Sequence, residues 1–105
     1  METDDRFDLC WCCEFVEHVE EQFRDNFLST FSFCNYVAMT HAVPGQGGHH
    51  HVNCQPKEYW IRHMNDFGFE FDKEMTNKLK KMAGEGKHFY STGLFFRKKT
   101  LKNDL

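Results

Sequence analysis

Phe-Asp-Leu-Cys-Trp-Cys-Cys at residues 7–13 is followed directly by Glu-Phe-Val-Glu-His at residues 14–18. The first part is short, rich in β-forming residues and almost wholly apolar, which predicts a strand covered on both faces. The second part brings three ionisable side chains within five residues. Open α/β sheets place their ligand chemistry at the carboxyl ends of strands, so this junction is the first candidate for a site.

Downstream of this junction, helix and strand patterns alternate. An apolar stripe predicts a helix over residues 20–33, a second helix runs from Gln55-Pro56 to Gly68, and a third, amphipathic helix has Met75, Leu79 and Met82 inward. Strands are expected at residues 36–40, 69–71 and 89–97. The order predicts one α/β domain over residues 1–105, a mostly parallel sheet of about four strands with helices on its faces, and a frayed tail at 98–105.

Composition narrows the class of protein. Of 105 residues, 40% are hydrophobic and twelve are Phe, which favours a folded domain over a disordered chain. A net charge of −3 argues against a protein that chiefly neutralises nucleic-acid phosphates. The basic segment 97–102 is compatible with contact to RNA. No apolar run spans a membrane. The acidic residues 1–6 and an odd number of cysteines, with no pair of Cys-x-x-Cys units, predict reduced thiols and a cytoplasmic location.

The ionisable residues after the first strand suggest a metal site. Helical spacing would put Glu14, Glu17 and His18 on one side, where two carboxylates repel unless a cation or protons intervene. Carboxylates suit Mg²⁺ or Mn²⁺, and an imidazole suits Mn²⁺, Zn²⁺ or iron. A fourth ligand would come from the glycine-rich loop with its three histidines at 49–51, among which we choose His51. The alternatives are a helix start without an ion and an exposed histidine loop.

One further histidine follows the second predicted strand. His41 is a candidate base on the substrate side. The alternative is a strand-end histidine whose ring is held by hydrogen bonds.

Several segments together resemble class I S-adenosylmethionine-dependent methyltransferases. Phe-Asp, an apolar strand and Glu-x-x-Glu-His-Val at residues 7–19 resemble the fourth strand and its turn. Residues 36–41 are similar to the fifth strand, 55–68 to the helix before the sixth, and 90–98 to the seventh, which is antiparallel in that family. The resemblance implies a partial Rossmann-like methyltransferase sheet whose last strand is antiparallel.

The resemblance covers only the later strands of that domain. The family holds S-adenosylmethionine mainly with a glycine-rich turn and an acidic strand end in its first half, and no Gly-x-Gly-x-x-Gly turn occurs here. The resemblance therefore implies that Cys13 and Glu14 form at most a partial cofactor site. It also implies that Gln46, Gly47 and Gly48 belong to a substrate-side loop.

Two subgroups of the family share the acidic motif. Small-RNA 2′-O-methyltransferases and ubiquinone-type O-methyltransferases carry Glu-x-x-Glu-His and a later loop histidine. In the former these side chains bind a metal that orients ribose hydroxyls. The similarity implies that Glu14, Glu17, His18 and His51 would bind Mg²⁺, Mn²⁺ or Zn²⁺.

A sheet that begins at its fourth strand leaves residues 7–13 as an unpaired apolar edge. We therefore expect association, with a second copy of the chain or with a complementary methyltransferase half. The isolated chain is expected to be inactive and to complete a split methyltransferase acting on a hydroxyl group. The alternatives are a non-catalytic, self-associating and metal-binding scaffold or binding module, and a truncated product without a role of its own.

Overall fold

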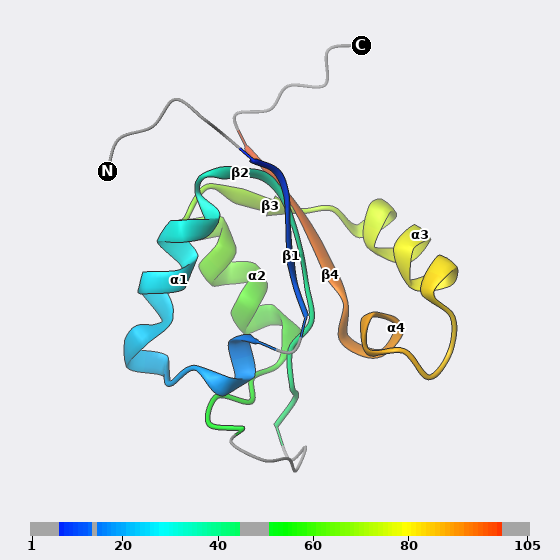
Figure 1. Cartoon of the computed structure of the whole chain (residues 1–105), viewed down its shortest axis with the longest axis horizontal. Helices are drawn as coiled ribbons and strands as arrows, with labels where there is room; N and C mark the ends of the chain where they lie inside the picture. The colour runs from blue at the N-terminus through cyan, green and yellow to red at the C-terminus, as the bar shows by residue number, and fades with distance from the viewer. Residues whose placement is uncertain (1–6, 14, 45–50, 100–105) are drawn as a thin grey trace.

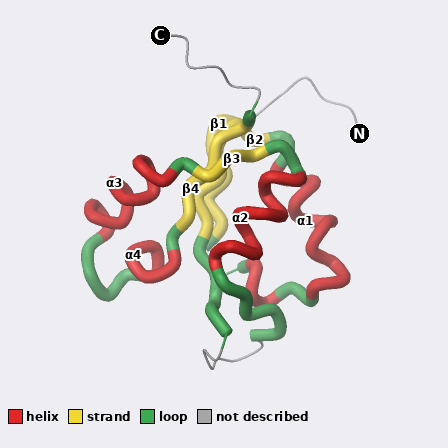
Figure 2. Tube along the Cα trace, turned by 180° about the vertical axis from the view of Figure 1, so that it is seen from behind, coloured by secondary structure: helices red, strands yellow, loops and turns green. Residues whose placement is uncertain are grey.

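The computed structural model describes residues 7–13, 15–44 and 51–99, which form three layers. Helices α1 and α2 cover one face of a four-stranded sheet, and α3 and α4 lie on the other (Figures 1 and 2). The elements in chain order are β1 (Phe7–Cys12), the 3-10 turns η1 (Val16–His18) and η2 (Glu21–Phe23), α1 (Arg24–Phe31), β2 (Cys34–Met39), α2 (Lys57–Asp66), β3 (Phe69–Phe71), α3 (Lys73–Ala83), α4 (His88–Thr92) and β4 (Leu94–Lys98).

The sheet has the strand order β1-β2-β4-β3. Strands β1 and β2 pair in parallel, with Cys10 opposite Val37, and β4 is antiparallel to both of its neighbours, β2 and β3. Three strands therefore run in one direction and the closing strand runs against them. The prediction of an α/β fold with four strands and an antiparallel last strand is confirmed at this level.

The main core lies between the sheet and the pair α1–α2. Trp60 and Met64, four residues apart on α2, have no exposed surface, and Leu28 of α1 is equally buried. They pack in one cluster with sheet residues that include Phe96. Helix α2 ends where Gly68 takes a φ of +90°, a backbone conformation that glycine adopts without steric cost and that turns the chain into β3.

The outer strand β1 differs from its prediction. Phe7, Leu9 and Trp11 are 65%, 51% and 60% exposed, so the strand is not covered on both faces. The physical reason is its place at the edge of the sheet. On the α3–α4 face of the sheet, the Phe89 ring stacks on the Trp11 ring, with 5.7 Å between the ring centroids. Phe7 and Leu9, at alternate positions of β1, remain exposed to solvent.

The prediction of a last strand over residues 89–97 is also wrong in its first half. Residues His88–Thr92 form the short helix α4, with Phe89 buried, and β4 begins only at Leu94. The frayed tail predicted from residue 98 begins too early, because Lys98 belongs to β4 and the Lys99 backbone N–H donates to Gly68 O at 2.8 Å. Residues 100–105 lie outside the described part.

Helix α3 has the predicted bounds, and of its predicted inward residues Met75 and Leu79 are half-buried, but the prediction for Met82 is wrong. Met82 is 80% exposed, whereas Thr76 is buried. The Thr76 hydroxyl donates to Asp72 O at 2.7 Å and accepts the Phe95 backbone N–H at 2.9 Å. These hydrogen bonds dock the start of α3 on β4, and Leu79 and Ala83, three and seven residues after Thr76, lie half-buried on the same side of the helix, which leaves Met82 outside it.

None of the five cysteines forms a disulfide bond with another in the structure. Burial raises the pKa of Cys12 to about 12 and that of Cys10 to about 11. Both thiols therefore stay protonated at neutral pH and act as small core side chains rather than nucleophiles or metal ligands. Within residues 7–44 and 51–99, apart from position 14, no helix has the length and apolarity needed to cross a membrane.

Candidate metal centre

Backbone hydrogen bonds bring two distant segments together at the carboxyl end of β1. The turn η1 follows this strand and carries Glu17 and His18. The backbone N–H groups of Val52 and Asn53 both donate to the Glu17 carbonyl oxygen, at 2.9 and 3.1 Å. This clamp places the neighbouring His51 beside the two residues of η1.

The three side chains converge on one point. One ligand atom each of Glu17, His18 and His51 lie within 4.8 Å of one another. The two imidazole rings meet edge to face, with centroids 4.9 Å apart. Glu17 is buried at 3% exposure, whereas His18 is exposed, so the cluster opens to solvent on the His18 side.

Two buried polar atoms in this cluster lack hydrogen-bond partners. Among the described residues, nothing pairs with Glu17 Oε1 or with His51 Nδ1. Burying a carboxylate oxygen without compensation is costly, and an unpaired imidazole nitrogen adds to that cost. A divalent cation held by Glu17 and His51 would offset such a cost, because a carboxylate oxygen and a ring nitrogen are its ordinary ligands. The donor set therefore fits a metal ion.

The chemistry of the donors also indicates which metals fit. Two imidazoles with one carboxylate suit Zn²⁺, Mn²⁺ or Fe²⁺ better than Mg²⁺, which prefers oxygen ligands. Three protein ligands leave positions open for water or a substrate oxygen, as in catalytic rather than structural zinc sites. The structure thus brings together three of the four predicted ligands. Glu14 lies outside the described residues, as do Gln46, Gly47, Gly48, His49 and His50.

The other predicted site residues lie at the same end of the sheet. Cys13 follows β1 and accepts a long hydrogen bond, 3.8 Å, from the Thr40 hydroxyl at the end of β2. His41 comes next and is buried, with Nδ1 3.1 Å from the Gln55 carbonyl oxygen. A carbonyl oxygen only accepts, so Nδ1 carries the proton and Nε2 is the acceptor. Burial lowers the pKa of His41, so the ring is neutral at pH 7.

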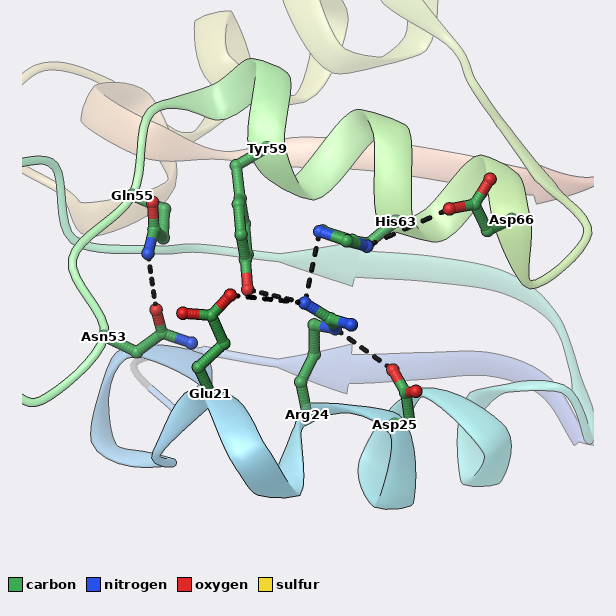
Figure 3. Close-up of polar contacts among 8 residues, drawn as sticks. All are labelled: Glu21, Arg24, Asp25, Asn53, Gln55, Tyr59, His63 and Asp66. Atoms are coloured by element: carbon green, nitrogen blue, oxygen red, sulfur yellow. Dashed lines mark hydrogen bonds and ion pairs between the residues drawn. The ribbon is translucent and has the colours of Figure 1, made fainter.

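Sequence reasoning missed Asn53, which helps to fix the segment carrying His51. Its side-chain oxygen accepts a hydrogen bond from Gln55 Nε2 at 2.9 Å (Figure 3). Asn53 is buried, and its backbone N–H is one half of the clamp on Glu17. An asparagine in a polar loop is the only sequence signal, and on its own it does not separate a structural amide from a solvated one.

A second polar cluster, also missed, ties α1 to α2 (Figure 3). Arg24 Nη1 donates to the Tyr59 hydroxyl at 2.9 Å and to His63 Nε2 at 3.2 Å. His63 Nε2 is thereby an acceptor, and Nδ1 faces Asp66 at 3.9 Å. The contacts span 35 and 39 residues of sequence, so local spacing gives no sign of them.

Two histidines with lowered pKa values, His63 of this cluster and His41, predict that stability depends on pH. Burial and then Arg24 and Arg62 lower the pKa of His63, and burial lowers that of His41. The unfolded chain binds protons on these rings below about pH 6.5, where the folded chain resists them, so stability rises with pH through this range. We expect the melting temperature of metal-free protein, kept in a chelator, to fall from pH 7.5 to pH 5.5. The variant His63→Gln should show a shallower fall, and an unchanged slope would contradict the role of His63.

Comparison with known proteins adds no relative to this description. No protein-family model, no curated protein and no solved structure matches the chain.

Proposed function

We propose that this chain is the metal- and substrate-binding part of a methyltransferase domain that transfers a methyl group to a hydroxyl group. The main support for this proposal is the convergence of Glu17, His18 and His51. Among the described residues, Glu17 Oε1 and His51 Nδ1 are buried and have no hydrogen-bond partner. These residues lie at the carboxyl end of a strand, where open α/β sheets hold ligands. Two of them belong to the Glu-x-x-Glu-His motif that resembles the metal-dependent methyltransferases.

The sheet supports the same proposal. A parallel pair, β1 and β2, is followed by an antiparallel closing strand, β4, as the resemblance implies for the last strands of a class I methyltransferase. Strand β1 lies at the sheet edge. The resemblance places the cofactor-binding half beyond this edge.

The chain's own residues would divide the work at the site. Glu17, His18 and His51 would hold the ion, with Glu17 kept in place by the backbone clamp from Val52 and Asn53. A bound Zn²⁺ or Mn²⁺ supplies Lewis-acid polarisation and a template for a hydroxyl group. His41, neutral and with Nε2 as acceptor, is the candidate to take a proton from that hydroxyl.

The methyl donor needs residues beyond those of this site. No glycine-rich turn of the Gly-x-Gly-x-x-Gly type occurs in the 105 residues. The residues that bind the sulfonium of S-adenosylmethionine would therefore have to lie outside this site. Positioning is a large part of what a methyltransferase contributes. The isolated chain is therefore proposed to be inactive alone.

Two calorimetric titrations test this proposal. Catechol, a vicinal diol, should bind the zinc- or manganese-loaded chain and not the chelator-treated chain, and S-adenosylmethionine should bind neither form tightly. Phenol, with a single hydroxyl, is the matched control and should bind more weakly. Equal catechol binding with and without metal would contradict the substrate role, and tight stoichiometric binding of S-adenosylmethionine would contradict the proposed division of the site.

A second candidate function is a non-catalytic module that self-associates through β1. The observation that favours it is the exposed apolar row Phe7, Leu9 and Trp11 on an edge strand, which is a template for pairing. Light scattering would then show a concentration-dependent dimer that Leu9→Lys disrupts. A monomer at all accessible concentrations would contradict this second candidate.

A further inference from the structure

A separate pocket of 220 Å³ lies among the end of β2, the start of α2, and α3 and α4. Its walls are mostly apolar and come from Val43, Pro44, Pro56 and Leu94. The polar residues that line it are Lys57, Lys80, Ser91, Thr92 and His41. It is therefore a small, mostly apolar pocket whose positive charges come from two lysines. None of the three candidate metal ligands lines it.

The two lysines have no acidic partner. Among the described residues, no carboxylate lines the pocket and neither ammonium group takes part in an ion pair. Burial, and then the like charge of Lys57, lower the pKa of Lys80. Two lysines that line one small pocket, with no carboxylate among its described lining residues, are the electrostatic pattern of an anion site.

The hydroxyl groups add donors beside the lysines. The Ser91 hydroxyl has no described partner, while the Thr92 hydroxyl is already engaged by the His41 backbone N–H at 3.4 Å. Lys57, Lys80 and Ser91 thus offer three donor groups, and a phosphate monoester carries three terminal oxygens that accept hydrogen bonds and nearly two negative charges. A carboxylate would have two oxygens and one charge for the same donors.

We propose that this pocket binds a phosphate monoester with a small apolar body. The phosphate contacts Lys57, Lys80 and the Ser91 hydroxyl, and the carbon body lies against Pro44, Pro56 and Leu94. Ligand pockets for drug-sized molecules begin near about 300 Å³, so a ligand of one ring or a short chain fits this volume. None of the three candidate metal ligands takes part in this binding, and His41, the candidate base, lies in the wall of the same pocket.

Phenyl phosphate is the probe, titrated by calorimetry into the 105-residue protein kept in a chelator so that no metal binds the phosphate. We expect saturable binding of one molecule per chain. Lys80→Met and Lys57→Met keep the apolar stem of the side chain and should each weaken binding about tenfold, the scale of one charge-assisted hydrogen bond. The matched control is Lys81→Met, on the same helix α3 but outside the pocket, which should leave the affinity unchanged.

Two further comparisons distinguish the pocket from the metal cluster and from a surface that attracts any anion. Glu17→Gln should bind phenyl phosphate like the wild type, because the metal cluster is not part of the pocket. Benzoate, with one charge, should bind more weakly than phenyl phosphate. The proposal is overturned if the wild type shows no saturable binding, if benzoate binds equally well, or if Lys81→Met weakens binding as much as Lys80→Met.

Discussion

Replacing Glu17 by glutamine is expected to abolish binding of Zn²⁺ or Mn²⁺ while leaving the metal-free protein at least as stable as the wild type. Mutation of a residue that only hydrogen-bonds to a metal ligand lowers the metal affinity by about 10- to 100-fold. Loss of a metal ligand itself should therefore lower the metal affinity by at least about 100-fold. Because Glu17 Oε1 is buried without a described partner, removing its charge also removes an uncompensated cost of folding.

Thermal unfolding with and without metal measures both effects. A ligand at 100 times its Kd stabilises a folded chain by about 2.7 kcal/mol, so wild-type protein should gain several degrees with zinc and Glu17→Gln should gain none. Glu20→Gln changes an exposed carboxylate outside the cluster and is the control. If Glu17→Gln keeps the zinc-induced gain, the carboxylate is not a ligand. If it loses stability without metal, Glu17 has a structural role instead.

Replacing Trp60 by alanine is expected to remove most of the stability of the fold. Trp60 has no exposed surface and packs in the cluster that joins α2 to the sheet. Truncating a buried tryptophan to alanine costs about 3–5 kcal/mol, a large share of the roughly 5–15 kcal/mol that stabilises a domain. Urea unfolding followed by circular dichroism measures this loss, since the substitution removes one of the two tryptophan fluorophores.

The second tryptophan is the matched control. Trp11 is 60% exposed on β1, so Trp11→Ala should cost less than about 1 kcal/mol in dilute protein. Trp60→Phe should cost less than Trp60→Ala, because it keeps most of the apolar volume and removes an indole N–H that has no described partner. Equal losses for Trp11→Ala and Trp60→Ala would contradict the placement of the core between the sheet and α2.

Periodicity and glycine placement predict much of the fold. The apolar stripe with Trp60 and Met64 identifies α2, and Gly68 identifies its end. The errors come where tertiary contacts outweigh local pattern. Residues 89–92 are β-prone but turn into α4, which buries Phe89. Met82 fits an inward stripe but remains exposed, because the side of α3 that packs inward follows Thr76, Leu79 and Ala83.

The candidate metal centre is predictable in part because its residues follow a strand. Glu17 and His18 come directly after β1, and the carboxyl end of a strand is where a ligand site is expected. In the sequence, only nearness to α2 favours His51, and what places it beside Glu17 is a pair of backbone hydrogen bonds from Val52 and Asn53. No residue type marks such a clamp. The lysine pocket escapes prediction for a similar reason, since Lys57 and Lys80 come from different helices.

X-ray absorption at the zinc edge, on wild-type protein without an affinity tag and loaded with one equivalent of zinc, tests the proposed centre most directly. We expect stoichiometric binding with two imidazole nitrogens and a carboxylate oxygen around the ion. A zinc environment made only of imidazoles, or the absence of stoichiometric zinc after buffer exchange, would contradict it.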